Sequence, residues 1–412
     1  MQHTQNVSVG GLILALASAV DLTGAHLHHE LAYHSHRVAY ICHEMAQVLG
    51  LPGPEQEALM FAALLHDCGL TRVRSRMEVV LADTGNTAEH CRRGAAFFTS
   101  APLLAGLAPV ILSHHDRWAG SNITGLAGRD IPLAARIIHL ADRVDVRLDH
   151  TGFILGQASS VLAAIRARAG SDFDPDLVDA LFDAAESEAF WFRIEEADHA
   201  QYLGPLGHNH LSAVELASIA APFAVIIDDK SPWTHRHSQG VAGVARELAA
   251  LVGIEETDHV YAAGLLHDLG KLGVPDELLD HPGKLDAGEF MVMKRHAYDT
   301  YRLLATVEGL DQLALWAALH HERLDGTGYP FRHRFLPLAA RVMAVADVFQ
   351  ALHQQRSYRP ALESQDVRRL LLAMATGGAL DPDIVDLACS HYRDLATIAR
   401  DGGRDFVAVG RN

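Results

Sequence analysis

Apolar residues recur along most of this chain with the period of an α-helix. In segments such as 241–252 and 362–374, apolar side chains rich in alanine and leucine return every three to four residues, which is the spacing of one helix face. No convincing run alternates apolar and polar residues, as a half-buried β-strand would. We therefore predict an all-α protein.

Two further helices are predicted from apolar runs with clear ends. The run from Val9 to Val20 is too short to span a bilayer and is closed by Asp21, which predicts a buried helix. Residues 211–221 predict another helix, which Pro222 is expected to end. The segment GPLGHNH at 204–210 has the composition of a linker.

The helical pattern is duplicated within the chain. Five segments recur in the same order, 201 to 207 positions later: 33–38 and 236–241, 62–69 and 263–270, 114–115 and 320–321, 132–142 and 337–347, and 173–179 and 380–386. This period is far longer than the 20 to 50 residues of solenoid repeats. We predict two tandem helical bundles related by duplication, at 1–203 and 211–412, joined by the linker at 204–210.

Composition, net charge and cysteine content limit which class of protein this can be and which partners it can bind. The 412 residues are 49% apolar and 21% charged, which predicts a soluble globular protein of more than one domain. A net charge of −17 argues against polymeric nucleic acid as a partner, although a small phosphate ligand needs only a local cation or metal. Four cysteines without a CxxC pair suit a reducing compartment, so we predict a cytoplasmic protein. Because the apolar run at 9–20 is too short to span a bilayer, we predict no membrane partner. The sequence allows a homodimer without selecting it.

The second half contains an ordered set of imidazoles and carboxylates, the ligand types that bind iron, manganese, nickel or zinc, with no thiolate among them. Its members are His237, His267, Asp268, His296, His320, His321 and Asp347. Seven ligands are more than one tetrahedral ion needs. The set suits two ions roughly 3.5–4 Å apart, an arrangement that activates water and clamps a phosphate.

The same set recurs in the first half. Its members there are His34, His66, Asp67, His90, His114, His115 and Asp142. A single histidine in such a position is more often a surface residue, or a buried residue with its ring nitrogens hydrogen-bonded, than a metal ligand. Ten of the 27 histidines fall on equivalent positions of the two copies, which argues against chance placement. We therefore predict two transition-metal ions in each copy.

The second half resembles the HD superfamily of metal-dependent phosphohydrolases, and within it the HD-GYP branch. The resemblance covers residues 231–394 and rests on LLHDLGKLGVPDELL at 265–279, HPGKL at 281–285, MKRH at 293–296, HHERLDGTGYP at 320–330 and VADVFQAL at 345–352. It implies HD-type helical bundles and a phosphodiesterase that uses iron or manganese. The implied reaction linearises cyclic di-GMP to pGpG and sometimes to GMP, while some members prefer cyclic GMP-AMP.

The resemblance also implies roles for individual residues. The seven side chains of the second half would bind the ions, with Asp268 as the catalytic bridge between them. Lys271 would lie beside the scissile phosphate, where its ammonium can stabilise developing charge or protonate the leaving oxygen; a solvated lysine is the plainer interpretation. Tyr329 would stack on a base, and glycines in this loop permit tight turns. The substrate contacts we predict are Lys284, Arg323, Gly328, Tyr329 and Pro330.

The second copy departs from the family at three positions. It has Ala297 where the family often has proline, and Thr300 where the family often has glycine. Some members hold a third ion through a glutamate four residues before the first histidine, a position occupied here by Trp233. The second copy is therefore expected to be dinuclear.

The first copy departs further. Glu30 stands four residues before His34 and would allow a third ion. The stretch HHDRWAGSNITG at 114–125 lacks GYP, and Leu70 stands where the second copy has Lys271. Three arginines, at 72, 74 and 76, could replace the lost cation or form a solvated basic loop. We expect hydrolysis chiefly in the second copy and a regulatory or altered role for the first.

Two other functions remain open at this point. One is a cyclic dinucleotide sensor or docking protein without turnover, which would bind nucleotide but not cleave it. The other is a diiron oxygenase activity in the first copy, because the superfamily includes members whose similar ligand sets bind dioxygen. Substrate-dependent oxygen consumption would distinguish the oxygenase from the phosphodiesterase.

Overall fold

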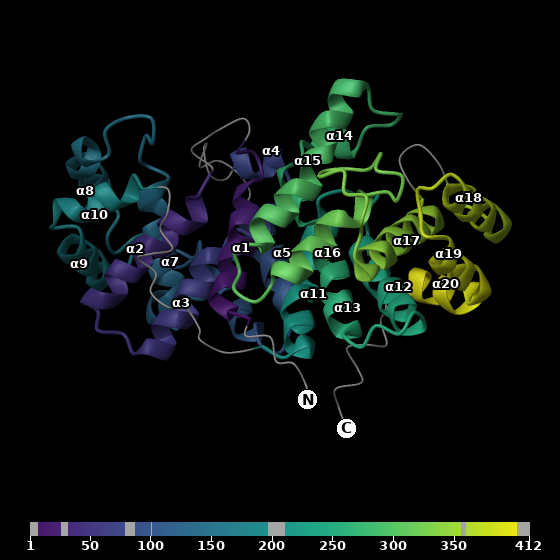
Figure 1. The fold of residues 1–412 in the computed structure, drawn as a ribbon. Coiled ribbons are helices and arrows are strands. Elements are labelled where there is room, and N and C mark those ends of the chain that lie inside the picture. The colour runs from purple at the N-terminus through teal and green to yellow at the C-terminus, as the bar shows by residue number, and fades with distance from the viewer. Residues whose placement is uncertain are drawn as a thin grey trace. The chain divides into compact units, whose positions relative to one another are not determined.

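The computed structural model describes residues 7–25, 32–78, 87–99, 101–196, 211–355 and 360–401. These residues form α-helices and short 3-10 turns, and no β-strand forms among them (Figure 1). The prediction of an all-α protein is confirmed. None of the helices in the described ranges has the length and apolar character needed to cross a membrane.

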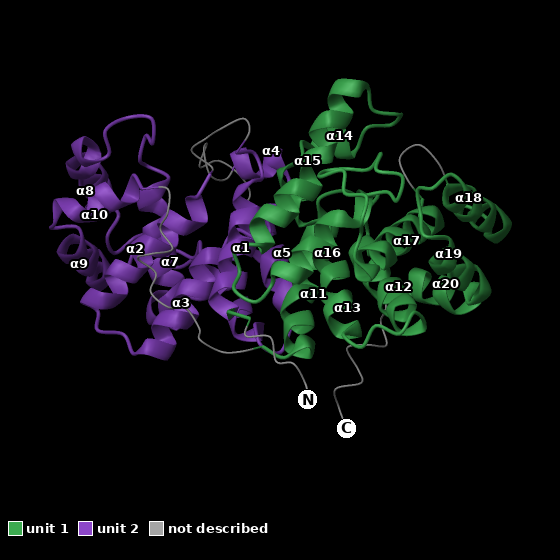
Figure 2. Ribbon diagram, viewed as in Figure 1, with its two compact units in different colours: residues 1–8, 209–412 green, residues 9–208 purple. Residues whose placement is uncertain are grey.

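The chain forms two compact units (Figure 2). The N-terminal unit comprises residues 9–208, and the C-terminal unit comprises residues 209–412 together with residues 1–8. The predicted linker at 204–210 lies outside the described residues, so the domain boundaries at 203 and 211 stay predictions.

The N-terminal unit is built around α2, which contacts α1, α3, α7 and α9. Its helices are α1 (Val9–Asp21), α2 (His34–Val48), α3 (Gly53–Leu65), α4 (Val73–Arg76), α5 (Thr87–Phe98), α6 (Ala108–Ser113), α7 (Leu133–Asp145), α8 (Ala158–Arg166), α9 (Pro175–Ala184) and α10 (Glu188–Ile194).

The C-terminal unit has the same plan around α12, which contacts α11, α13, α17, α19 and α20. Its helices are α11 (Ala213–Asp229), α12 (His237–Leu251), α13 (Thr257–Leu266), α14 (Asp276–Leu279), α15 (Ala287–Leu304), α16 (Asp311–Ala318), α17 (Leu338–His353), α18 (Ser364–Thr376), α19 (Pro382–Ser390) and α20 (Tyr392–Asp401). Two 3-10 turns, η7 (Leu269–Gly273) and η8 (Leu319–His321), follow α13 and α16.

The helices predicted from the sequence are present, but the C-terminal end predicted for one of them is wrong. The segments 9–20, 241–252 and 362–374 correspond to α1, α12 and α18. The predicted end at Pro222 is wrong, because α11 continues through this proline to Asp229. Phe223 and Ile227, which follow the proline, are buried. Their burial offsets the hydrogen bond that proline cannot donate.

The start of the central helix is held in the same way in both units. Tyr33 and Arg236, which precede α2 and α12, both adopt left-handed backbone angles, with φ of 63° and 57°. The next turn is then capped by a carboxylate from the preceding helix. The backbone N–H of Ser35 donates to Asp21, and that of Ser238 donates to Asp228. These contacts place the first histidine of each set at the start of its helix.

Candidate metal centres

In the C-terminal unit, all seven predicted ligands converge on one place. His237 begins α12, His267 and Asp268 follow α13, His296 lies in α15, His320 and His321 lie in η8, and Asp347 lies in α17. Gly270 allows this convergence, because a Cβ there would lie 2.1 Å from the carbonyl oxygen of His296. The turn after the His-Asp pair can therefore pack directly on α15.

Asp268 lies between two pairs of histidines. Its Oδ2 is 3.7 Å from Nε2 of His237 and 3.2 Å from Nε2 of His267. Its Oδ1 is 3.5 Å from Nε2 of His296 and 3.8 Å from Nε2 of His320. A carboxylate with each oxygen facing a separate pair of imidazoles has the geometry needed to bridge two ions.

Asp347, in α17, contacts two histidines of the same cluster, one with each carboxylate oxygen. Its Oδ1 lies 3.1 Å from Nε2 of His237, and its Oδ2 lies 3.8 Å from Nδ1 of His321. The seven side chains therefore form one connected set rather than two separate groups.

The N-terminal unit repeats this arrangement around Asp67. Its Oδ2 lies 3.7 Å from Nε2 of His34 and 3.6 Å from Nε2 of His66. Its Oδ1 lies 3.5 Å from Nε2 of His90 and 3.7 Å from Nε2 of His114. Both units thus place one aspartate between two histidine pairs.

Asp142 completes the N-terminal cluster but has an additional partner. It faces His34 at 3.5 Å and His115 at 3.8 Å, as Asp347 faces His237 and His321. Its Oδ2 also receives a 2.7 Å hydrogen bond from Arg143, where the C-terminal unit has Val348. The predicted third-ion ligand, Glu30, lies outside the described residues.

Comparison with known proteins identifies the family. Residues 31–147 and 223–384 each match a family model described as HD domain. Over 399 residues the chain is 34% identical to 3'3'-cGAMP-specific phosphodiesterase 1 of Vibrio cholerae serotype O1, covering 93% of this chain and 91% of that protein. The chain belongs to the HD superfamily of phosphohydrolases. The prediction of two tandem HD domains is confirmed.

Two further relatives of the HD protein were found. Over 173 residues it is 32% identical to a cyclic di-GMP phosphodiesterase of Thermotoga maritima, covering 40% of this chain and 47% of that protein. The solved structure of a cyclic GMP-AMP-specific phosphodiesterase of Vibrio cholerae matches with a TM-score of 0.64 at 26% identity. That match covers 96% of this chain and 98% of the other.

Backbone carbonyls orient the histidines of the C-terminal HD domain. Nδ1 of His267, His296 and His320 lies 2.6–2.8 Å from the carbonyl oxygen three residues earlier. With Nδ1–H donating to these carbonyls, the lone pair of Nε2 faces the cluster. Nε2 of His267 and Oδ1 of Asp268 are buried without a hydrogen-bond partner. Such orphaned acceptors fit a bound cation.

The protonation states also fit metal binding, which needs neutral imidazoles and ionised carboxylates. Burial lowers the pKa of His296 to about 4 and the pKa of His321 to about 3. Burial raises the pKa of Asp268, but His267 and Lys271 outweigh it and hold that pKa well below its usual value. His267 differs, because Asp268 and Asp347 raise its pKa despite burial.

Lys271 reaches the cluster from the turn η7. Its Nζ lies 2.5 Å from Oδ2 of Asp268, and 16% of its side chain is exposed. The corresponding Leu70 of the N-terminal HD domain is buried and packs against Met77 and Val146. Of the three nearby arginines, two have partners elsewhere, because Arg74 pairs with Glu78 and Arg76 pairs with the buried Asp21.

The GYP loop lies against the histidine pair. A Cβ at Gly328 would lie 2.5 Å from the backbone of Glu322 and of Arg323, so this position requires glycine. The peptide bond between Tyr329 and Pro330 is cis. The Tyr329 ring lies 4.8 Å from the ring of His321, centroid to centroid, and its backbone N–H donates to the His321 carbonyl. The ring is therefore next to the metal-ligand set.

Three residues near this loop were not singled out from the sequence. Lys294 places its Nζ over the rings of Phe290, at 4.8 Å, and of Tyr329, at 5.4 Å. Glu322 is buried and accepts hydrogen bonds from the backbone N–H groups of residues 331 and 332. A signal existed for Phe290 and Lys294, which lie six and two residues before His296, respectively.

Two predicted substrate contacts lie in exposed loops. Lys284 is exposed in the loop before α15, and Arg323 is exposed in the loop after η8. Their role in substrate binding stays a prediction.

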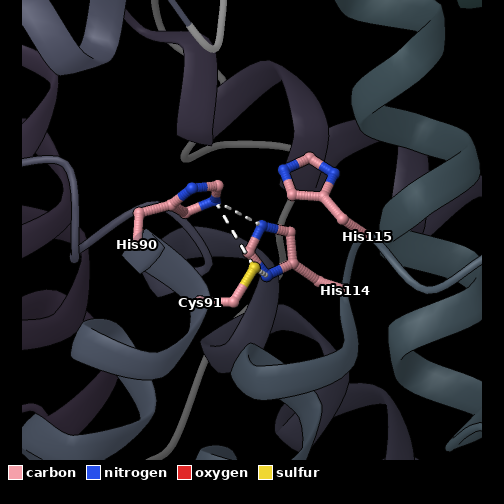
Figure 3. A group of neighbouring side chains, drawn as sticks. All are labelled: His90, Cys91, His114 and His115. Carbon is pink, nitrogen blue, oxygen red and sulfur yellow. Dashed lines mark hydrogen bonds between the residues drawn. The ribbon is translucent and has the colours of Figure 1, made fainter. Parts of the chain in front are cut away.

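The N-terminal cluster is more closed and contains a thiol. The side chains of His115 and Asp142 are 10% and 2% exposed, against 28% and 11% for His321 and Asp347. Cys91 lies among its histidines (Figure 3). Cys91 follows His90 on α5 and faces the same space, whereas the C-terminal domain has Ala297 at this position.

Proposed function

We propose that the C-terminal HD domain hydrolyses a phosphodiester bond of a cyclic dinucleotide, cyclic di-GMP or 3'3'-cGAMP. The observation that carries this proposal is Asp268, whose two oxygens face two separate pairs of histidines beside Lys271. The activities named for the relatives in Vibrio cholerae and Thermotoga maritima support the substrate class. The proposed ions are two first-row transition metals, iron or manganese first, with nickel or zinc as alternatives.

The seven ligands would hold the ions, with Asp268 as the bridge. When bound, such ions polarise a phosphoryl oxygen and lower the pKa of water. The protein supplies the rest of the site. The positive Nζ of Lys271 lies beside Asp268, where it would stabilise charge on the phosphate or give a proton to the leaving oxygen. The Tyr329 ring offers a base a flat surface within reach of the cluster.

For the N-terminal HD domain we propose metal binding with a regulatory or altered role. Its ligand set is arranged like that of the C-terminal domain, which supports two ions, with Glu30 as the proposed ligand of a third. Leu70 supplies no charge where Lys271 supplies one, and Arg143 already binds a carboxylate oxygen of the cluster. Both differences disfavour hydrolysis there.

The test uses the full-length protein loaded with iron or manganese. We expect it to linearise cyclic di-GMP, 3'3'-cGAMP or both, as measured by chromatography of the products. Asp268→Ala should abolish turnover. Asp67→Ala, the same change at the equivalent position of the other domain, should retain it.

Two outcomes would contradict the proposal. If the metal-loaded protein binds these nucleotides without cleaving them, the protein is a sensor. If Asp268→Ala cleaves them as fast as the unchanged protein, the C-terminal cluster is not the active site.

A further inference from the structure

Lys294 is a cation beside the GYP loop that has no carboxylate partner. Its Nζ is 4.8 Å from the centre of the Phe290 ring and 5.4 Å from the centre of the Tyr329 ring. The neighbouring Arg295, in contrast, is paired with Asp299 at 3.0 Å. Among the described residues, no carboxylate forms an ion pair with Lys294. Its charge is therefore available to an anionic ligand.

Two aromatic rings hold this ammonium in place. Phe290 and Lys294 lie four residues apart in α15 and share one face of the helix. The ring of Phe290 stands nearly perpendicular to that of Tyr329, with an interplanar angle of 86°, and the ammonium contacts both. A side chain that is positioned in advance loses less conformational entropy on binding a ligand than a mobile one.

The ammonium of Lys294 and the metal-ligand set contact the same aromatic ring. The centre of the Tyr329 ring lies 4.8 Å from the centre of the His321 ring. Lys271, in contrast, contacts the bridging carboxylate of Asp268 directly. The C-terminal domain therefore has two lysines at different places in its site, one at the bridging carboxylate and one at the ring of the GYP loop.

The second lysine belongs to one copy of the duplication. The N-terminal domain has Ala88 at the equivalent position, two residues before His90, and its residues 114–125 contain no tyrosine. Lys294 and the ring that it contacts are thus found, like Lys271, in the copy for which hydrolysis is proposed.

A cyclic dinucleotide carries two phosphodiester groups, each with one negative charge. In the proposed reaction the ions and Lys271 act on the group that is cleaved, so the second group needs a separate cation. Lys284 and Arg323 are exposed in loops, whereas Lys294 is half-buried and held by two rings.

We propose that Lys294 binds the second phosphodiester of the substrate, the one that is not cleaved. Its ammonium would donate charge-assisted hydrogen bonds to the two oxygens of that group that lie outside the ring. The proposal rests on the proposed function and deepens it. Lys294 would make the site select a ligand with two phosphodiesters over a ligand with one.

The experiment compares two substrates of the full-length, metal-loaded protein. One is cyclic di-GMP or 3'3'-cGAMP, whichever the unchanged protein cleaves, and the other is bis(p-nitrophenyl) phosphate, which carries a single phosphodiester. In Lys294→Met, KM for the cyclic dinucleotide should rise at least about tenfold, because a charge-assisted hydrogen bond is lost. Its kcat should change much less, since the contact is the same in the ground state and the transition state. The kcat/KM for bis(p-nitrophenyl) phosphate should fall by a much smaller factor.

Two further variants separate the lost charge from a general effect of substitution. Lys294→Arg keeps a cation that stacks on aromatic rings and binds phosphate, so it should restore most of the lost affinity. Arg295→Met is the matched control. It removes a cation from the next position of α15, where the guanidinium already pairs with Asp299, and KM should stay unchanged.

Two results would overturn the role of Lys294 alone. If the unchanged protein cleaves a cyclic dinucleotide and Lys294→Met has the same KM, Lys294 does not bind the substrate. If kcat/KM falls equally for both substrates, Lys294 only supports the Tyr329 ring. If the unchanged protein cleaves neither cyclic dinucleotide, the proposed function is wrong, and the role of Lys294 is wrong with it.

Discussion

Nδ1 of His34 lies 2.7 Å from Oδ2 of Asp145, a buried carboxylate that also accepts two hydrogen bonds from Arg37. Burial lowers the pKa of His34, but the hydrogen bond and charge of Asp145 outweigh it and raise that pKa. In the C-terminal domain, Nδ1 of His237 instead lies 2.9 Å from the amide oxygen of Gln354. A carboxylate partner orients a ligating imidazole and makes it more basic, whereas an amide mainly orients it.

The first prediction concerns Gln354. Gln354→Ala removes the group that orients His237, so the affinity of the C-terminal domain for metal should fall about tenfold. Competition with a chromogenic chelator measures this change. Gln354→Glu, which copies the carboxylate of the N-terminal domain, is the control and should keep or raise the affinity. An unchanged affinity in Gln354→Ala would show that the hydrogen bond does not position the ring.

The second prediction concerns Lys271. Lys271→Leu introduces the residue that the N-terminal domain has at the equivalent position, Leu70. It should lower kcat for the cyclic dinucleotide by about 10²–10³, because a positioned cation is lost from the site where charge develops. Metal content should not change, since lysine is not a ligand, and Lys271→Arg should retain part of the activity. If kcat is unaffected, Lys271 acts elsewhere.

Gly328→Ala should displace the GYP loop, because the new methyl group would lie 2.5 Å from backbone atoms that cannot yield. We expect at least about a tenfold loss of kcat/KM, since a small displacement of a positioned group can cost up to about a hundredfold. Gly288→Ala is the matched control, as its methyl group would meet only the Asp286 side chain at 3.3 Å. Equal activity of the two variants would contradict the role assigned to this close approach.

The equivalent residues Asp21 and Asp228 should respond differently to the same change. Asp21 is in a buried ion pair with Arg76, at 2.6 Å, so Asp21→Asn should destabilise the N-terminal domain by about 3–5 kcal/mol. Burial raises the pKa of Asp228 to about 8, so this carboxyl is protonated at pH 7. Asp228→Asn should therefore cost less than about 1 kcal/mol.

Urea unfolding at pH 7, followed for each domain's transition, compares the two variants. Because the folded pKa of Asp228 exceeds its unfolded value of 3.8, the folded chain retains a proton that the unfolded chain loses. Stability of the unchanged C-terminal domain should consequently fall as pH rises from about 4 to about 8. Asp228→Asn should remove that slope, and a slope that persists would contradict the assignment.

His139 should make the N-terminal domain sensitive to acid. Burial, reinforced by the charge of Arg143, lowers the pKa of His139 to about 3. Between pH 6.5 and about 3 the unfolded chain binds a proton that the folded chain does not, so stability falls as pH falls. The slope from this one group is at most about 1.4 kcal/mol per pH unit.

His139→Ala, which copies Ala344 of the other domain, should make this slope shallower even if it lowers stability at pH 7. Unfolding curves across this pH range provide the measurement. A slope equal to that of the unchanged protein would mean that His139 titrates normally.

The sequence was sufficient for the features that depend on local pattern. Helical periodicity predicted the fold class, and the recurrence of five segments predicted two related domains. The repeated histidines and aspartates identified candidate ligands, and each of those within the described residues lies in one of the two clusters. Their metal binding stays a prediction. The end of α11 was mispredicted, because a local rule about proline could not include the burial of Phe223 and Ile227.

By itself, therefore, the sequence determined the helical class, the duplication and the types of residue available for chemistry. Tertiary packing alone decided which atoms meet. Asp145 reaches His34 across 111 positions of the chain, and His114 is 23 positions from Cys91. Spacing along a sequence carries no information about such contacts, because they depend on how distant helices are rotated and packed against each other. This packing makes the N-terminal cluster less exposed, with Cys91 beside it, and the C-terminal cluster more exposed, with Lys271 beside it.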